Sequence, residues 1–404
     1  MKFLFAWRYF KAKKSTNAIN IISWVSVSAI ILGTASLIVV LSVFNGLEDL
    51  VRSLYSSFYT DVKISPASGK FIRIPYTTLL KLKQTDGVIG YSLTIEDNAL
   101  LQYNSLQPVM LKGVDDHFKE INGVSKNILK GIYNIGSPEH PAAILGSGIE
   151  YSLNIEADRA ISPMTVYLFR NGNINPADPG AAVRSEPLIS AGSFKIQEDF
   201  DDHYVITNLG FIQRMLGLDS NQYGAIEIAT RDGLVDKTLK SRLQALFGAD
   251  FLIRTRDEQN QTLFGTMKME KWVIYIILTL ILAVAAFNIV GALTMLVLEK
   301  KKDIQVLKAM GADNGFIRQI FLNEGILLGL IGGGLGFGLA ILLCWMQVNF
   351  KLVPLQGNFL IDYYPVKLIA TDFVLVGSTI LIVVLLASWI PARKAALQPF
   401  ELKS

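Results

Sequence analysis

Four long apolar runs without a charged residue or a histidine constrain this chain more than any other feature. They cover residues 18–44, 272–298, 325–348 and 373–390. Each reaches the roughly 18 residues expected of a membrane span, whereas helices of soluble proteins average about 11–12 residues. Only 18% of the residues are charged, against about 25% in soluble domains. The runs therefore predict four transmembrane helices and not the buried helices of a soluble core.

The placement of lysine and arginine predicts the orientation of these spans. Basic residues crowd the N-terminal segment, the loop after the second span and the C-terminal tail, while the loop after the third span has only Lys351 and Lys367. Basic loops stay in the cytoplasm, so we expect both termini inside (N-in, C-in). The first run is too long for a cleaved signal peptide, and no A-x-A-like site follows it. We therefore expect a retained anchor.

These observations predict the domain organisation. The expected segments are a cytoplasmic amphipathic segment (1–17), a transmembrane helix (18–46), an extracytoplasmic stalk and domain (47–270), a transmembrane helix (271–298), a short cytoplasmic helix (299–313), a transmembrane helix (314–348), a short extracytoplasmic loop (349–371), a transmembrane helix (372–391) and a cytoplasmic tail (392–404).

The large segment between the first two spans alternates short β-rich runs with helical ones, which is typical of an α+β fold. We expect two subdomains and an exposed loop at 171–187, which is rich in Asn, Gly and Pro. The segment has no cysteine, so it must fold on its own apolar core. The predicted strands are 61–65, 91–103, 109–114, 142–145, 164–169, 187–197, 203–207, 223–229 and 251–255, and the predicted helices are 76–84, 147–153, 209–216 and 235–247.

Periodic residues also predict how the long helices continue and pack. Apolar residues at helical spacing in 47–59 predict that the first helix runs on as a stalk, and polar residues 257–271 predict a second stalk. In the third span, Gly325, Gly329 and Gly333 recur every four residues, a pattern that lets helices pack tightly within or between subunits. Gly311 and Asp313 suit the end of one helix and the start of the next.

The sequence has no motif of an enzyme, a metal site or a cofactor site. It contains no G-x-x-x-x-G-K-[ST] phosphate loop and no G-x-S-x-G turn, and its three histidines are far apart. The net charge of +4 is explained by basic inner loops and does not indicate nucleic acid. Because the four runs hold no ionisable residue, they argue against an ion-coupled carrier or channel. Any work must then draw energy from a partner.

Several segments closely resemble the FtsX-like permeases, and within them the lipoprotein-releasing (Lol) permease subunits. They are residues 285–290, the run 299–312 (EKKKDIQVLKAMGA), 316–321, 324–325, Arg8-Tyr9, 37–46, and 390–396 with Pro399. The resemblance covers all four spans in order. It implies a subunit of the bacterial inner membrane with a MacB-like periplasmic core domain. It also implies a homodimer or heterodimer of permeases, served by a cytoplasmic ATPase dimer that binds ATP and Mg.

The resemblance also implies candidate sites. The helix after the second span would couple to the ATPase, with Ile304, Leu307 and Met310 as its apolar contacts; an ordinary amphipathic loop is the alternative. The full set for this coupling helix is Glu299, Lys302, Ile304, Leu307, Met310 and Gly311.

The implied activity is the extraction of acylated lipoproteins from the outer leaflet for a periplasmic carrier. Candidates that would face lipid or cargo are Ile38, Leu41, Phe44 and Leu47, although packing against neighbouring helices is equally open for each. In this family one subunit type docks the carrier through a hairpin. The 171–187 loop, with Asn175, Pro176 and Pro179, occupies about that place but departs from the family's sequence.

Two alternatives stay open at this point. The chain could be another member of the superfamily that serves efflux, as MacB does, or the control of cell-wall hydrolases, as FtsX does. FtsX proteins have smaller external domains than this chain, which weighs against that role. MacB proteins carry the ATPase on the same chain, whereas this chain has no ATPase motif. The second alternative is a membrane scaffold or sensor that works without ATP and has no need of a coupling helix.

Overall fold

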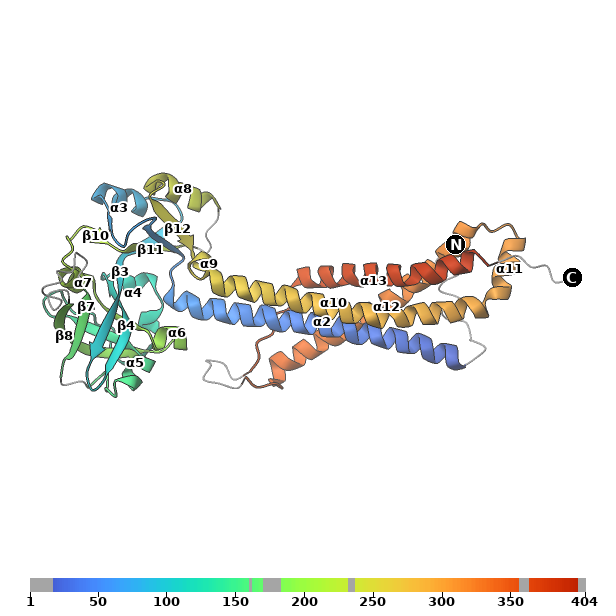
Figure 1. Ribbon diagram of the computed structural model, residues 1–404, viewed down its shortest axis with the longest axis horizontal. Helices are drawn as coiled ribbons and strands as arrows, with labels where there is room; N and C mark the ends of the chain where they lie inside the picture. The colour runs from blue at the N-terminus through green and yellow to red at the C-terminus, as the bar shows by residue number, and fades with distance from the viewer. Residues whose placement is uncertain (1–16, 160–161, 170–182, 232–236, 356–362, 399–404) are drawn as a thin grey trace, which may run out of the picture. The chain divides into compact units, whose positions relative to one another are not determined.

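The computed structural model describes residues 17–159, 162–169, 183–231, 237–355 and 363–398 (Figure 1). The chain divides into two compact units. We call Met1–Leu50 with Gly265–Ser404 the helical unit, and Val51–Phe264 the α+β unit. Each unit is described by itself.

Apart from residues 51–58 and 261–264, which belong to the α+β unit, the helical unit holds the long helices. They are α2 (Asn17–Phe58), α10 (Gln261–Glu299), α12 (Asn314–Phe350) and α13 (Ala370–Ala396), with the short α11 (Lys301–Ala309) between α10 and α12. Four of the described helices are long and apolar enough to cross a membrane, which confirms the predicted spans. The helix α2 has 42 residues without a break, so the predicted continuation of the first helix is also confirmed. At about 1.5 Å per residue it far exceeds the ~30 Å hydrocarbon core.

The last helix extends further than the sequence predicts. The pattern predicts an end at Pro391, but α13 continues through this proline to Ala396. Proline removes one N–H donor from a helix and does not by itself unfold the next turn. Here Ala392 and Ala395 are fully buried in the core of the helical unit. Their packing holds the final turn in place.

The glycines of α12 lie against two neighbouring helices. A Cβ atom added to Gly325 would lie 1.8 Å from Ser388 Oγ, and one added to Gly329 would lie 2.9 Å from a methyl carbon of Val384. The predicted Gly325, Gly329 and Gly333 face therefore packs on α13 of the same chain, with Gly333 in looser contact. A second glycine face, which the sequence pattern did not single out, packs on α2 through Gly332 and Gly336.

We expect the replacement of Gly336 with alanine to destabilise the helical unit. The new Cβ would lie 2.6 Å from Thr34 Cβ and 2.8 Å from the Ile31 carbonyl oxygen, and such overpacking costs about 1–3 kcal/mol. The matched control is Gly334→Ala, because nothing lies within 4 Å of a Cβ at that position. The control should be neutral or gain up to about 1 kcal/mol from helix propensity. Thermal unfolding in detergent measures both, and equal effects would contradict the packing.

The α+β unit contains every strand and helix predicted for it, most of them with shifted ends. Its elements are β1 (Val62–Pro66), β2 (Ile72–Arg73), α3 (Tyr76–Lys83), β3 (Val88–Gln102), β4 (Leu106–Val114), α4 (Phe118–Ile121), the 3₁₀ turn η1 (Val124–Lys126), β5 (Ile128–Gly131), β6 (Ala142–Gly146), α5 (Ser147–Ser152), β7 (Met164–Phe169), β8 (Val183–Phe194), α6 (Glu198–Asp201), β9 (Tyr204–Asn208), α7 (Leu209–Leu216), β10 (Gln222–Tyr223), β11 (Ala225–Thr230), α8 (Lys237–Phe247), β12 (Phe251–Thr255) and α9 (Arg256–Gln259).

One sheet runs through this unit. Apart from the small β2–β10 pair, the described strands form a ten-stranded sheet in the order β12-β1-β11-β3-β4-β9-β6-β8-β5, and β7 pairs with β3 and β8. The expected division into two subdomains is therefore not a division of the sheet. Separate apolar clusters lie along the sheet, one of them beneath α3 and α8 and another beneath α7. The central hairpin β3–β4 carries Glu96 and Lys112, two members of a network of ion pairs (Figure 1).

Candidate functional site

A helix, α11, is present where the coupling helix was predicted, but the burial of its apolar residues differs from the expectation. Ile304 is buried in the core of the helical unit and Leu307 is half-buried, so Ile304 cannot serve as an outward contact. The exposed apolar residues are Met310, with 79% of its surface accessible, and Val306, with 58%. The sequence pattern could not separate these faces, because an amphipathic stripe does not say which apolar residues its own chain covers.

The ends of α11 are held in place. Gly311 has a φ of +92°, which suits glycine at a helix end, and Asp313 caps α12 by accepting from the Phe316 N–H at 3.0 Å. Both predicted caps are confirmed. Lys308 Nζ donates to the carbonyls of Ala396 and Gln398 at 2.9 and 2.7 Å. Lys302 is exposed, and Glu299 is the last residue of α10. The helix is thus tied to the end of α13.

Of the four candidates for contact with lipid or cargo, two are buried. Ile38 and Leu41 lie in the core of the helical unit, where they pack against other helices of the same chain. For these two residues the burial favours the alternative that was left open, packing against neighbouring helices. Phe44 and Leu47 are half-buried and keep an accessible surface. The carrier-docking candidates Asn175, Pro176 and Pro179 and the N-terminal segment 1–16 lie outside the described residues.

Asn45 joins three long helices within the helical unit. Its Nδ2 donates to Asp372 Oδ2 at 2.6 Å, and Lys271 Nζ donates to Asn45 Oδ1 at 2.5 Å. Asn45 and Asp372 are both buried. The charges that bracket the apolar runs of α10 and α13 therefore compensate each other through one amide on α2. Buried polar groups need such partners.

The last turn of α2 is bound into the α+β unit. The Asn122 side chain donates to the Phe58 carbonyl, and the Gly123 N–H donates to Ser57 O at 3.0 Å. These bonds satisfy carbonyls that a helix C-terminus leaves without partners. The buried Phe58 ring stacks on Phe200, with ring centroids 4.2 Å apart. A shift of α2 along its axis must either break these contacts or move the surrounding strands.

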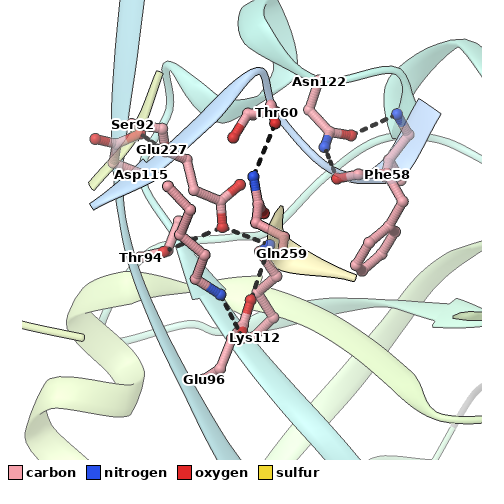
Figure 2. A network of polar contacts seen from close by, with 12 residues as sticks. Phe58, Thr60, Ser92, Thr94, Glu96, Lys112, Asp115, Asn122, Glu227 and Gln259 are labelled. Atoms are coloured by element: carbon pink, nitrogen blue, oxygen red, sulfur yellow. Dashed lines mark hydrogen bonds and ion pairs between the residues drawn. The ribbon is translucent and has the colours of Figure 1, made fainter. Parts of the chain in front are cut away.

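The segment that leads into α10 is tied to the same place. Arg52 of α2 pairs with Asp257 of α9 at 2.5 Å. Gln259 Nε2 donates at 3.1 Å to the carbonyl of Thr60, which follows α2. The end of α2 and the start of α10 are therefore linked inside the α+β unit (Figure 2).

A buried ionic network lies directly beside this attachment (Figure 2). Strand register places Glu96 opposite Lys112, and Lys63 opposite Glu227. Because side chains alternate across a strand, these residues and Thr94 share one face of the sheet. Lys112 Nζ lies 2.6 Å from Glu227 Oε1 and 3.0 Å from Glu96 Oε1, and Lys63 donates to Glu96 at 2.8 Å. We call these four charged residues the buried network.

The buried network also contacts aromatic rings. The Nζ of Lys112 lies 5.1 Å from the ring centroid of Phe58 and 5.0 Å from that of Phe118. Cations are attracted to the faces of aromatic rings, most strongly where water is excluded. Lys112 is fully buried, so its charge helps to hold the final residue of α2. This network links four strands, β1, β3, β4 and β11, to the helix end.

Opposite charges keep the network ionised. Burial alone would lower the pKa of Lys112, but the carboxylates of Glu227 and Glu96 outweigh burial and raise this pKa well above its ordinary value. Burial would raise the pKa of Glu96, but Lys63 and Lys112 hold it well below its usual range. This network was not predicted from the sequence. The available signal was a single charge inside an apolar strand, as in VMLKGV and AIEIAT.

Comparison with known proteins supports the predicted resemblance. The model of the FtsX-like permease C-terminal family matches residues 275–399, and that of the MacB-like periplasmic core domain matches residues 23–166. The "Lipoprotein-releasing system transmembrane protein LolC" of Xylella fastidiosa (strain Temecula1) is 26% identical and covers 98% of this chain and 96% of its own length. The corresponding LolE of Haemophilus influenzae is 27% identical, and the match covers 100% of this chain and 99% of LolE.

A solved structure, the periplasmic region of MacB from Actinobacillus actinomycetemcomitans, is also similar. It matches with a TM-score of 0.34 and 14% identity, and it covers 51% of this chain and 94% of that one. Among the described residues, no group of three or more His, Cys, Asp or Glu side chains could hold a metal ion.

Proposed function

We propose that this chain, which belongs to the FtsX-like permeases and carries a MacB-like periplasmic core domain, extracts lipoproteins from the inner membrane as the permease subunit of an ATP-driven complex. The relatives that match over nearly the whole chain are named for lipoprotein release, which supports the cargo class. ATP and Mg belong to a separate cytoplasmic ATPase dimer. A second permease subunit, either another copy of this chain or a related one, completes the membrane part.

The observation that carries the mechanical part of this proposal is the continuity of α2. This single helix begins at Asn17, contains an apolar stretch long enough to span a membrane, and ends at the buried Phe58. The bonds from Asn122 and Gly123 and the buried network hold that end in the α+β unit. A force applied to α2 in the membrane is thereby transmitted to the periplasmic sheet, so ATP hydrolysis can act on cargo at the outer leaflet without a pore.

In our proposal the ATPase acts on α11, and the resulting force reaches α2. Met310 and Val306, exposed at α11, would enter a groove of the ATPase, while Ile304 and Lys308 fasten the helix to the rest of the unit. Phe44 and Leu47, the two α2 candidates that stay accessible, would contact lipid or the acyl chains of cargo. Pulling an acyl chain from lipid costs about 0.8 kcal/mol per CH₂, so extraction of a multiply acylated protein needs this external energy.

Depletion of the chain tests the function. In its native bacterium we expect acylated lipoproteins to accumulate in the inner membrane, and we expect the purified chain to bring down an ATPase with a Walker motif in mild detergent. Normal lipoprotein sorting after depletion, with the ATPase still bound, would show that lipoproteins are not the cargo. It would favour a role in efflux or in the control of cell-wall hydrolases. If no ATPase copurifies with the chain, the proposal of an ATP-driven transporter is wrong, and a membrane scaffold is favoured.

A further inference from the structure

The α+β unit contains an open cavity of about 790 Å³ next to the attachment of α2. Its walls include five aromatic rings, and they come from the end of α2 and from β7, α6 and β9: Tyr55, Tyr59, Phe169, Phe200 and Tyr204. Leu100 of β3 and Met110 of β4 add aliphatic surface. The volume lies within the roughly 300–1,000 Å³ typical of small-molecule sites.

The cavity lies on the same face of the sheet as the buried network. Along β3, Leu100 and Asn98 continue the alternation that begins with Thr94 and Glu96, and β4 pairs Asn98 with Met110. The charged residues Lys63 and Lys112 are absent from its lining, as is every other lysine and arginine of the described residues. A phosphate or a carboxylate would find no positive partner there. The chemistry of the cavity therefore favours an uncharged, apolar ligand.

One polar atom in the cavity wall points to the kind of group that accompanies the apolar part. The Nδ2 atom of Asn260 is buried, and among the described residues it has no hydrogen-bond partner. Other polar groups of the wall are engaged at Asp199, since Tyr55 donates to its carboxylate at 2.6 Å and the His203 ring contacts its carbonyl at 3.1 Å, while Asn98 is exposed. A buried donor without a partner costs about 1–3 kcal/mol. Because Nδ2 is itself inaccessible, the Asn260 side chain must turn toward the cavity before a neutral ester or amide carbonyl of the ligand can accept from it.

We infer that this cavity binds an acyl chain of the cargo, with its ester or amide carbonyl accepting from Asn260. The inference rests on the proposed function, which supplies an acylated substrate. It adds a holding site in the periplasmic domain, separate from the lipid-facing candidates Phe44 and Leu47. Since Tyr55 and Tyr59 come from α2 and the residue that follows its last turn, a movement of α2 would reshape the wall. The binding and release of the acyl chain are thereby coupled to the movement of α2.

The test uses the complete complex in lipid nanodiscs and a synthetic lipopeptide whose acyl chain carries a diazirine. After illumination, mass spectrometry should find the label on peptides that contain Tyr55, Met110 or Phe200. The variant Phe169→Asp places a charge at the cavity wall and should reduce this labelling by about tenfold or more, because burying an unpaired charge is unfavourable. Phe169 is 55% exposed, so the variant should fold.

Two controls make the result specific. Leu129→Asp introduces the same charge at a residue of β5 with 53% exposure that is not in the cavity wall, and it should leave labelling unchanged. Asn260→Leu should weaken labelling by the ester-linked probe and spare an alkyl probe without a carbonyl. Equal labelling in Phe169→Asp and Leu129→Asp, or label only in the membrane helices, would overturn the acyl site.

Three further outcomes test the acyl assignment and separate it from the proposed function. If a photoreactive peptide without acyl chains labels the same residues equally well, the cavity takes apolar side chains and the acyl assignment is wrong. If the wild-type complex releases lipoproteins but the cavity is never labelled, the acyl site fails while the function stands. If the wild-type complex releases no lipoprotein at all, and the lipopeptide labels no part of it, both fail.

Discussion

Replacing Lys112 with methionine is expected to destabilise the α+β unit by about 3–5 kcal/mol, because Glu96 and Glu227 would lose their shared buried partner. The five tryptophans of the chain lie outside this unit, so tryptophan fluorescence would not report the change. Hydrogen–deuterium exchange of the full-length protein is the suitable measurement. Amides of β3, β4 and β11 should exchange faster by a factor of at least roughly 100, because each loss of about 1.4 kcal/mol changes the opening equilibrium constant tenfold.

The matched control for this experiment is Lys70→Met. Lys70 also pairs with a carboxylate, that of Asp97 at 3.0 Å, but 61% of its side chain is exposed. Asp97 has only 9% of its side chain exposed, but its Oδ1 keeps the Asn98 N–H as a donor at 2.9 Å. A pair with a solvated lysine contributes little, so this variant should lose much less protection than Lys112→Met. Adding Glu96→Gln and Glu227→Gln to Lys112→Met removes the unpaired charges and should recover much of the protection. Equal effects of the two lysine variants would show that the buried network does not hold this unit.

The second large effect is expected at α11, where Met310→Asp should abolish the stimulation of the partner ATPase. Met310 is the most exposed apolar residue near this helix, and a residue central to an interface often contributes 2 kcal/mol or more, which is roughly 30-fold in affinity. A carboxylate in that interface would also remain unpaired. ATP hydrolysis by the reconstituted complex, with and without lipoprotein, measures the loss.

The control is Met269→Asp, which makes the same change at an exposed methionine of α10, far from α11 in the sequence. ATP hydrolysis should then stay near the wild-type rate. Ile304→Ala tests the corrected orientation of α11, since a buried isoleucine lost from the core should lower thermal stability by about 2–5 kcal/mol. Normal ATPase stimulation in Met310→Asp would contradict the proposed contact.

Much of the fold could be predicted because the relevant signals are local in the chain. Helix α7 was predicted with the ends that the structure has, since Asn208 caps its first turn by accepting from Gly210 and Gly217 ends it with a positive φ. Strand β7 was likewise predicted from its own alternation. The short strand β5 was missed because its four residues, mostly exposed, show no alternation between buried and exposed positions.

The candidate site could be predicted only in part. The position of α11 and its caps follow from adjacent residues, but the burial of Ile304 depends on its packing against the other helices of the helical unit. The same is true of Ile38 and Leu41, which are as apolar as any residue that faces lipid. An apolar stripe in a membrane protein has the same sequence pattern whether lipid or a neighbouring helix covers it, because both surroundings are apolar.

By itself, the sequence determined that this protein has four apolar helices, an α+β domain after the first of them, and a helix between the second and third that resembles a coupling helix. Length, charge depletion and periodicity are properties of contiguous residues, so they need no knowledge of the fold. Only the tertiary structure decided which face of α11 is free, and that Lys112, Glu96 and Glu227 meet beneath Phe58. These contacts join residues up to 115 positions apart, as between Lys112 and Glu227, and strand register and helix rotation settle such contacts.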